Sequence, residues 1–370
     1  MHRTKPLFAA ATLGLFACSD PTPADDRPES NRSRPVAEIP DPGGSTPYRR
    51  ELTMAIRGET VIIAHGGKLE AIDQASGARR TLAELSGPSI FGRSIVADDR
   101  FVYATTRTPS GGASPTHAEH ETGDLVAVPL AGGPMETLFA VENVDCRLVL
   151  DRGQLLTCDD SGLQTSGRLI TVDVATRQVK TARFGRGRFC LSVMPVGDEL
   201  LALMLDDVLR PTTASLVALP SGAADDESIA ADEEVFVLTG LAASTRTAAL
   251  DGEVVVERFA RDPEAGDQTT LLAVARSGAV RPIRTLAANE DAWAIAGGRM
   301  VVGRRPDGKN TFRRVCEGGR LTSIDLATTA ESVLTTGVCS TAFGLTADAA
   351  RTAFVEDDID DVLRVKVLAL

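Results

Sequence analysis

Aromatic residues and histidine are scarce in this chain of 370 residues, and basic residues are outnumbered by acidic ones. The 12 phenylalanines, 2 tyrosines and 1 tryptophan offer little material for an aromatic sugar-binding surface, and 4 histidines argue against a histidine-rich metal centre. Lys+Arg 39 against Asp+Glu 51 gives a net charge of -12, which argues against nucleic acid as a partner because its phosphates require a basic surface. A hydrophobic content of 43% with Gly 33 and Pro 19 is instead typical of a folded protein with many turns.

The apolar run at residues 6–17 is too short to span a bilayer as a mature helix, and it follows the basic residues Arg3 and Lys5. It ends in the sequence LFAC, which resembles the lipobox of bacterial lipoproteins. The resemblance implies that residues 1–17 are a cleaved signal peptide and that Cys18 becomes a lipidated amino terminus anchored in a membrane. It also implies a place in the cell envelope, at the outer membrane and facing the periplasm or the cell surface, because Ser19 follows the cysteine. An ordinary secretory signal with an incidental Cys18 is the alternative.

Residues 18–50 form the next segment, in which positions 19–45 contain six prolines and hardly an apolar side chain. Such a composition cannot bury enough surface to offset its ordering entropy, so we expect a disordered tether. Residues 36–39 (VAEI) are its one candidate strand. We expect residues 51–370 to form a single domain.

A short motif recurs through residues 51–370: a polar residue, then Leu, two residues, then Val or Ile. Clear copies are 68–73 (KLEAID), 124–129 (DLVAVP) and 168–173 (RLITVD). The Leu or Val of successive copies lies at positions 69, 125, 169, 216, 271, 321 and 362, at intervals of 41 to 56 residues. A period near 50 with several short strands per repeat is the signature of a β-propeller. The sequence therefore predicts an all-β fold of seven four-stranded antiparallel blades.

Turn signals divide each repeat into strands. Asp251-Gly252 and the stretch Asp151-Arg152-Gly153 precede the motif and supply the positive φ that a tight hairpin needs. This count gives six complete blades and a seventh, residues 339–370, whose chain ends at its third strand. An open ring exposes a sheet edge, so residues 36–39 are the candidate for a closing strand.

Residues 51–370 resemble a bacterial β-propeller of the periplasmic type, and residues 128–138 are similar to repeats of envelope lipoproteins. This resemblance is to an architecture, so it implies no catalytic residue. The Gly-His and Trp-Asp pairs of WD repeats and the Ser-x-Asp-x-Gly-x-Thr-Trp box of sialidases are absent. Quinoprotein blades each dock a tryptophan, and this chain has only Trp293.

Two groups of side chains are candidates for metal binding. One is a cluster in a Gly- and Pro-containing loop, where two imidazoles and a carboxylate have the chemistry of zinc or copper ligands: His117, His120 and Glu121. The other is a set of acidic doublets expected at the ends of second strands, which have the oxygen ligands of a calcium site or the charge to attract a basic partner: Asp159, Asp160, Asp206, Asp207, Asp357 and Asp358. Solvated loops and turns are the interpretation that we favour for both groups, so no cofactor is expected beyond these calcium and zinc alternatives.

The five cysteines that follow Cys18 form no Cys-x-x-Cys pair, and export would place them where disulfides form. We rank Cys316–Cys339 first, because that bridge would join the last complete blade to the incomplete one. The Cys146–Cys158 pair across one hairpin ranks second, which leaves Cys190 free. A Cys146–Cys190 bridge is the competing arrangement.

No motif specifies a reaction, since Gly-x-Ser-x-Gly is missing and no Ser/His pair is placed by a motif. The sequence leaves open whether the protein is an enzyme, and favours a lipid-anchored binding or scaffold module for an unidentified envelope protein or ligand. A propeller hydrolase or lyase that uses a divalent ion or acidic residues in the central channel is the alternative. Acidic or histidine side chains gathered around one pocket would favour the enzyme, and a channel without them would favour binding.

Overall fold

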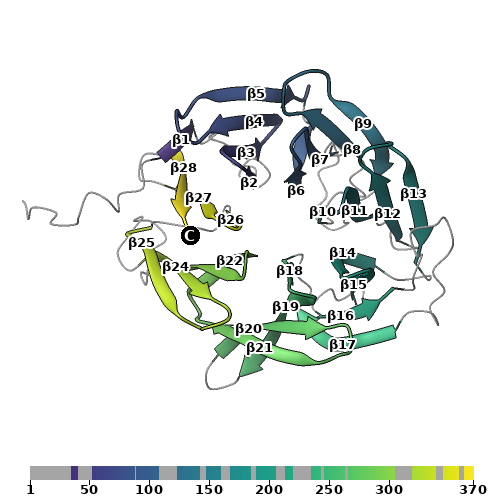
Figure 1. Ribbon diagram of the computed structural model, residues 1–370, viewed down its shortest axis with the longest axis vertical. Helices are drawn as coiled ribbons and strands as arrows, with labels where there is room; N and C mark the ends of the chain where they lie inside the picture. The colour runs from purple at the N-terminus through teal and green to yellow at the C-terminus, as the bar shows by residue number, and fades with distance from the viewer. Residues whose placement is uncertain are drawn as a thin grey trace, which may run out of the picture. The chain divides into compact units, whose positions relative to one another are not determined.

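The computed structural model describes residues 35–40, 52–87, 89–107, 123–141, 147–159, 167–184, 189–205, 213–219, 235–242, 246–262, 266–304, 319–338, 345–357 and 362–370. Within these ranges the chain forms seven sheets of four antiparallel strands, arranged in a ring (Figure 1). The predicted all-β, seven-bladed propeller is confirmed. No helix of the described residues is long and apolar enough to cross a membrane.

The blades follow one another along the chain, each running from the innermost strand to the outermost. Blade 1 is β2 (Leu52–Arg57), β3 (Thr60–His65), β4 (Lys68–Asp73) and β5 (Arg79–Glu84); blade 2 is β6 (Ile90–Ala97), β7 (Phe101–Arg107), β8 (Gly123–Pro129) and β9 (Glu136–Val141). Blade 3 is β10 (Val149–Asp151), β11 (Gln154–Asp159), β12 (Arg168–Asp173) and β13 (Val179–Arg183); blade 4 is β14 (Phe189–Val196), β15 (Glu199–Leu205), β16 (Thr213–Ala218) and β17 (Val235–Ala242). Blade 5 is β18 (Ala248–Leu250), β19 (Glu253–Asp262), β20 (Gly266–Ala275) and β21 (Val280–Leu286); blade 6 is β22 (Glu290–Ala296), β23 (Arg299–Arg304), β24 (Arg320–Asp325) and β25 (Glu331–Thr336). Blade 7 is β26 (Leu345–Ala347), β27 (Arg351–Asp357), β28 (Val362–Ala369) and β1 (Pro35–Pro40).

The middle strands of each blade are apolar on both faces because neighbouring blades cover them from both sides. Val61, Ile62 and Ile63 of β3 are all fully buried. Ile62 packs in the cluster between blades 1 and 2, whereas Val61 and Ile63 pack in the cluster between blades 1 and 7. The core is therefore a series of apolar layers between blades, with the recurring motif of the sequence on the third strand of each sheet.

A capped turn follows the third strand of blade 1. The Asp73 carboxylate accepts hydrogen bonds from the Ser76 N–H (2.8 Å) and the Ser76 hydroxyl (2.6 Å), which lower the pKa of Asp73. The residue after Ser76 is Gly77, whose φ of 69° lies in the left-handed region. The same turn recurs in blades 3 and 6, where its residues are Asp173, Thr176 and Arg177, and Asp325, Thr328 and Thr329.

Strand β1 completes blade 7 and joins the two ends of the described chain. It pairs antiparallel with β28, with Ile39 opposite Leu363. Ile39 is 1% exposed and belongs to the core between blades 1 and 7. Arg79 of blade 1 also donates to the Glu38 carbonyl oxygen at 2.8 Å. The segment 36–39 thus covers the open sheet edge, and β1 fixes it against blades 7 and 1.

A disulfide between described residues joins neighbouring blades instead of closing one hairpin. Cys158 of β11 is bonded to Cys190 of β14, with their Cα atoms 5.9 Å apart. The predicted Cys146–Cys158 bridge and the prediction that Cys190 stays free are wrong, because the middle strand of blade 3 faces the innermost strand of blade 4. Both sulfurs lie in the apolar layer between these two blades. Cys146 and the predicted Cys316–Cys339 pair lie outside the described residues.

Candidate functional site

Most of the site residues proposed from the sequence lie outside the described part of the chain: Cys18, His117, His120, Glu121, Asp160, Asp206, Asp207 and Asp358. Asp357 is the last residue of β27, and its side chain is likewise not described. Among the side chains that are described, no group of three or more His, Cys, Asp or Glu is placed to hold a metal ion.

Asp159 is the one acidic candidate with a described side chain. It is 1% exposed, lies opposite Arg168 in the β11–β12 ladder, and forms an ion pair with that residue. A carboxylate that is enclosed in a sheet and neutralised by a neighbouring guanidinium contributes to the blade core. Asp159 is therefore neither part of an exposed acidic face nor a solvated turn residue.

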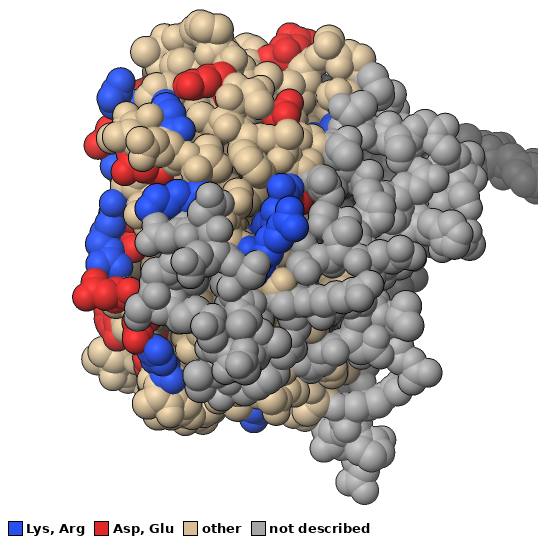
Figure 2. All heavy atoms as spheres, turned by 90° about the vertical axis from the view of Figure 1, so that its right-hand side faces the viewer, with Lys and Arg blue, Asp and Glu red and all other residues tan. Residues whose placement is uncertain are grey.

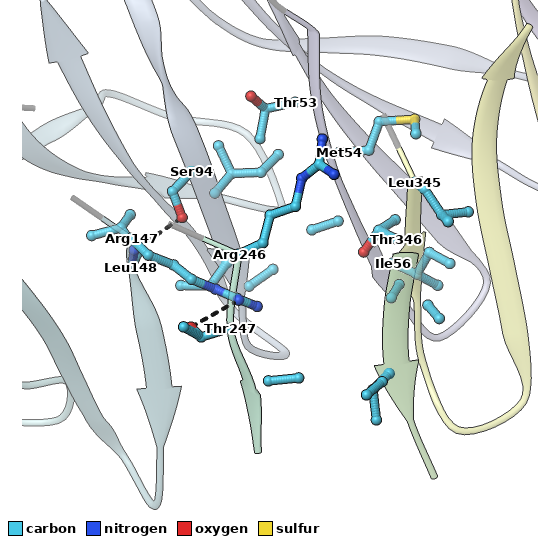
Figure 3. A pocket seen from close by; sticks show the side chains of 18 of the residues that line it. Thr53, Met54, Ile56, Ser94, Arg147, Leu148, Arg246, Thr247, Leu345 and Thr346 are labelled. Atoms are coloured by element: carbon cyan, nitrogen blue, oxygen red, sulfur yellow. Dashed lines mark hydrogen bonds between the residues drawn. The ribbon is translucent and has the colours of Figure 1, made fainter. Parts of the chain in front are cut away.

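A hollow with a volume of about 600 Å³ lies between the innermost strands of the ring, and we call it the central channel. Its wall is built from the innermost strands β2, β6, β10, β18, β22 and β26 and the residues just before them (Figure 3). A hollow of this size is in the range that holds small organic ligands.

The described wall of this channel carries positive charge and hydroxyl groups. Arg57, Arg147 and Arg246 line it, and no described lining residue is Asp, Glu or His. Arg57 is paired with the exposed Asp99 through a 2.7 Å contact, so its charge is balanced at the surface. By contrast, acidic and basic side chains are interspersed over the described outer rim in Figure 2. The chain as a whole has an excess of acidic residues, so the positive charge of the described channel wall is a local feature that composition does not predict.

Arg147 is the best-defined of these cations. Its Nη1 donates a hydrogen bond to Thr247 Oγ1 at 3.2 Å (Figure 3). The Thr247 hydroxyl in turn lies 3.0 Å from the buried Ser192 hydroxyl. Among the described residues no carboxylate forms an ion pair with Arg147, and desolvation by the surrounding wall lowers its pKa. A guanidinium has five N–H donors, so several donors of Arg147 are available to a ligand in the channel.

Arg246 occupies the same position in blade 5 that Arg147 occupies in blade 3. Asp151 is the last residue of β10, and Leu250 is the last residue of β18. Arg147 lies four residues before Asp151, and Arg246 lies four residues before Leu250. Arg246 is exposed, and in Figure 3 its side chain extends toward the side of the channel where Thr53 and Met54 lie. The two arginines therefore approach the channel at one level from two blades.

Sequence reasoning missed this pair, although a signal was present. If the innermost strands are aligned on the turns that end them, Arg147 and Arg246 share one column of the repeat with Thr53 of blade 1 and Ser94 of blade 2. The residues in this column can be read from the sequence. Whether the column faces the channel or a neighbouring blade cannot, because that depends on how the blades pack around the ring.

Comparison with known proteins supports the architecture. No protein-family model matches the chain, and no curated protein matches its sequence. Among solved structures, the chain is similar to Kuenenia stuttgartiensis hydrazine synthase (10% identity, TM-score 0.56), covering 88% of this chain and 97% of that one. It is similar to a mutant puromycin hydrolase complexed with PGG (15% identity, TM-score 0.51), covering 86% of this chain and 53% of that one. A Mycobacterium tuberculosis puromycin-hydrolyzing peptidase matches with 12% identity and a TM-score of 0.50, covering 78% of this chain and 45% of that one.

The chain spans about half the length of the two puromycin-cleaving enzymes. At these identities the similarities show the fold alone. The chain is accordingly a seven-bladed β-propeller protein, and its function must be argued from its own channel.

Proposed function

We propose that this protein is a binding module that holds an anionic ligand in its central channel. The observation that carries the proposal is Arg147, a desolvated guanidinium whose described partner is one threonine hydroxyl, in a channel wall with no described carboxylate. A desolvated charge with no ionic partner among the described residues is costly to a fold, and an incoming carboxylate or phosphate would offset that cost. Arg246 adds a second positive charge at the same level.

The alternative of a hydrolase or lyase would require acidic residues or a divalent ion in the channel. The described wall supplies guanidinium groups and hydroxyls, which bind anions directly. The side chains therefore support binding better than catalysis by paired carboxylates.

An isothermal titration with acetate and with inorganic phosphate, at constant ionic strength set by chloride, tests the proposal on the purified full chain. We expect saturable binding of at least one anion to the wild type, and at least a tenfold loss of affinity in Arg147→Met, which keeps an unbranched apolar stem and removes the guanidinium. The matched control is Arg281→Met, which changes an arginine of outer strand β21. Equal affinities of wild type and Arg147→Met for every anion that binds would overturn the proposal.

The lipobox-like sequence supports a further element of the proposal, namely that the module is anchored in the cell envelope through a lipid on Cys18. Its ligand would then be an unidentified molecule of the periplasm or cell surface. Cys18→Ala should move the protein from the membrane fraction to the soluble fraction. A Cys18→Ala protein that is processed and still sediments with membranes would contradict the anchor.

A further inference from the structure

The channel has a second level with a different chemistry. One or two residues before the turn that ends the innermost strand, blades 1, 2, 3 and 6 place a half-buried apolar side chain that lines the channel and also packs against an apolar layer between blades. We call this set the apolar belt: Ile56, Val96, Leu150 and Ile295. Blade 7 places Ala347 at the position that corresponds to Ile56, because both residues lie one residue before the turn.

The belt and the arginines lie at different heights along the channel. All innermost strands run in the same direction along the channel axis, since every blade starts at the centre and turns back at the same face of the ring. Two to three residues separate the level of Arg147 and Arg246 from the belt. At about 3.3 Å per residue of strand, that is a separation of about 7–10 Å.

A ligand that fills both levels needs an anionic group at one end and an apolar body that extends from it. We infer that the channel takes an amphiphilic organic anion, whose charged group meets Arg147 and whose apolar part contacts the belt. This inference rests on the proposed function, because it assigns a ligand class to the same channel. Small inorganic anions satisfy only the arginine level, and they leave the apolar belt exposed to water.

The experiment compares three probes by isothermal titration on the purified full chain: octanoate, acetate and 1-octanol. Octanoate carries the charge and the apolar body, acetate carries only the charge, and 1-octanol carries the body without the charge. We expect octanoate to bind at least tenfold more tightly than either of the other two, because burial of its chain adds to the contact with Arg147.

Substitutions in the belt separate the two levels. Val96→Thr keeps the shape of the side chain and adds a hydroxyl, so it should weaken octanoate at least threefold and leave acetate unchanged. Val333→Thr is the matched control, since Val333 is 51% exposed on outer strand β25. If Val96→Thr does not fold, Ile56→Thr makes the same test from blade 1.

The outcomes distinguish the two proposals. Equal affinities for octanoate and acetate, both lost in Arg147→Met, would overturn the amphiphile and retain the anion site. Binding of 1-octanol as tight as that of octanoate, unchanged in Arg147→Met, would overturn the anion site as well. A tenfold preference for octanoate that Val96→Thr reduces and Val333→Thr does not is the result that supports the inference.

Discussion

Removal of the Cys158–Cys190 bridge should lower the free energy of unfolding by about 3.7 kcal/mol. The two cysteines are 32 residues apart in sequence, and they hold blade 3 to blade 4. In the chain-entropy model, cross-linking a loop of this length restricts the unfolded chain by an entropy that corresponds to about 3.7 kcal/mol at 25 °C. The folded chain is already held at this point by the apolar layer, so the loss appears through the unfolded state.

The cleanest measurement is urea unfolding with and without dithiothreitol, followed by the fluorescence of Trp293, the one tryptophan of the chain. Reduction breaks the bond without changing side-chain volume, whereas Cys→Ala variants also leave small cavities, because Cys158 and Cys190 are 1% and 2% exposed. The double variant Cys158→Ala/Cys190→Ala is the control for other bridges. The difference between wild type and double variant in their response to dithiothreitol isolates this bond.

Equal responses of the two proteins to dithiothreitol would refute the reasoning. So would peptide mapping under non-reducing conditions that joins Cys158 to Cys146. A bridge inside one hairpin would close a loop of about a dozen residues, and its removal would cost about 2.8 kcal/mol by the same model.

Three further perturbations test the fold. Ile39→Ala should lower the free energy of unfolding by about 2–4 kcal/mol, because Ile39 is 1% exposed; a loss below about 0.5 kcal/mol would show that β1 does not close the ring. Thr329→Gly should raise it by about 0.5–1 kcal/mol, since Thr329 has a φ of 59°, while Gly77→Thr at the equivalent turn should lower it. Burial raises the pKa of Glu290, but hydrogen bonds from Arg284 and the Ala287 N–H outweigh this effect and hold the pKa below 4.5. The ionised carboxylate therefore stabilises the fold above pH 4.5, and this contribution is lost as the pH falls through the pKa of the folded state. Glu290→Gln should reduce the loss of stability at acid pH, measured by urea unfolding at several pH values.

The architecture could be predicted because its signals are local. The copies of the motif at 68–73, 124–129 and 168–173 form the third strands β4, β8 and β12, and Asp251-Gly252 makes the expected hairpin turn with Asp251 at a φ of 43°. Strand alternation and turn chemistry depend on neighbours in sequence, so a repeat in the sequence implies a repeat in the structure. The candidate closing strand at 36–39 follows from the same reasoning, because a seventh blade with three strands needs a fourth.

The chemistry of the molecule depends on contacts between blades, which no single repeat contains. Cys158 finds Cys190 in the next blade, and Arg147 of blade 3 reaches Thr247 of blade 5 across the channel wall. The sequence around Asp159 is typical of an exposed acidic turn, but in the structure its side chain forms a buried ion pair with Arg168. The repeat period thus specifies how many blades there are and how each one pairs its strands. Closure of the ring decides which side chains of different blades meet, because that depends on packing between sheets whose residues are far apart in the sequence.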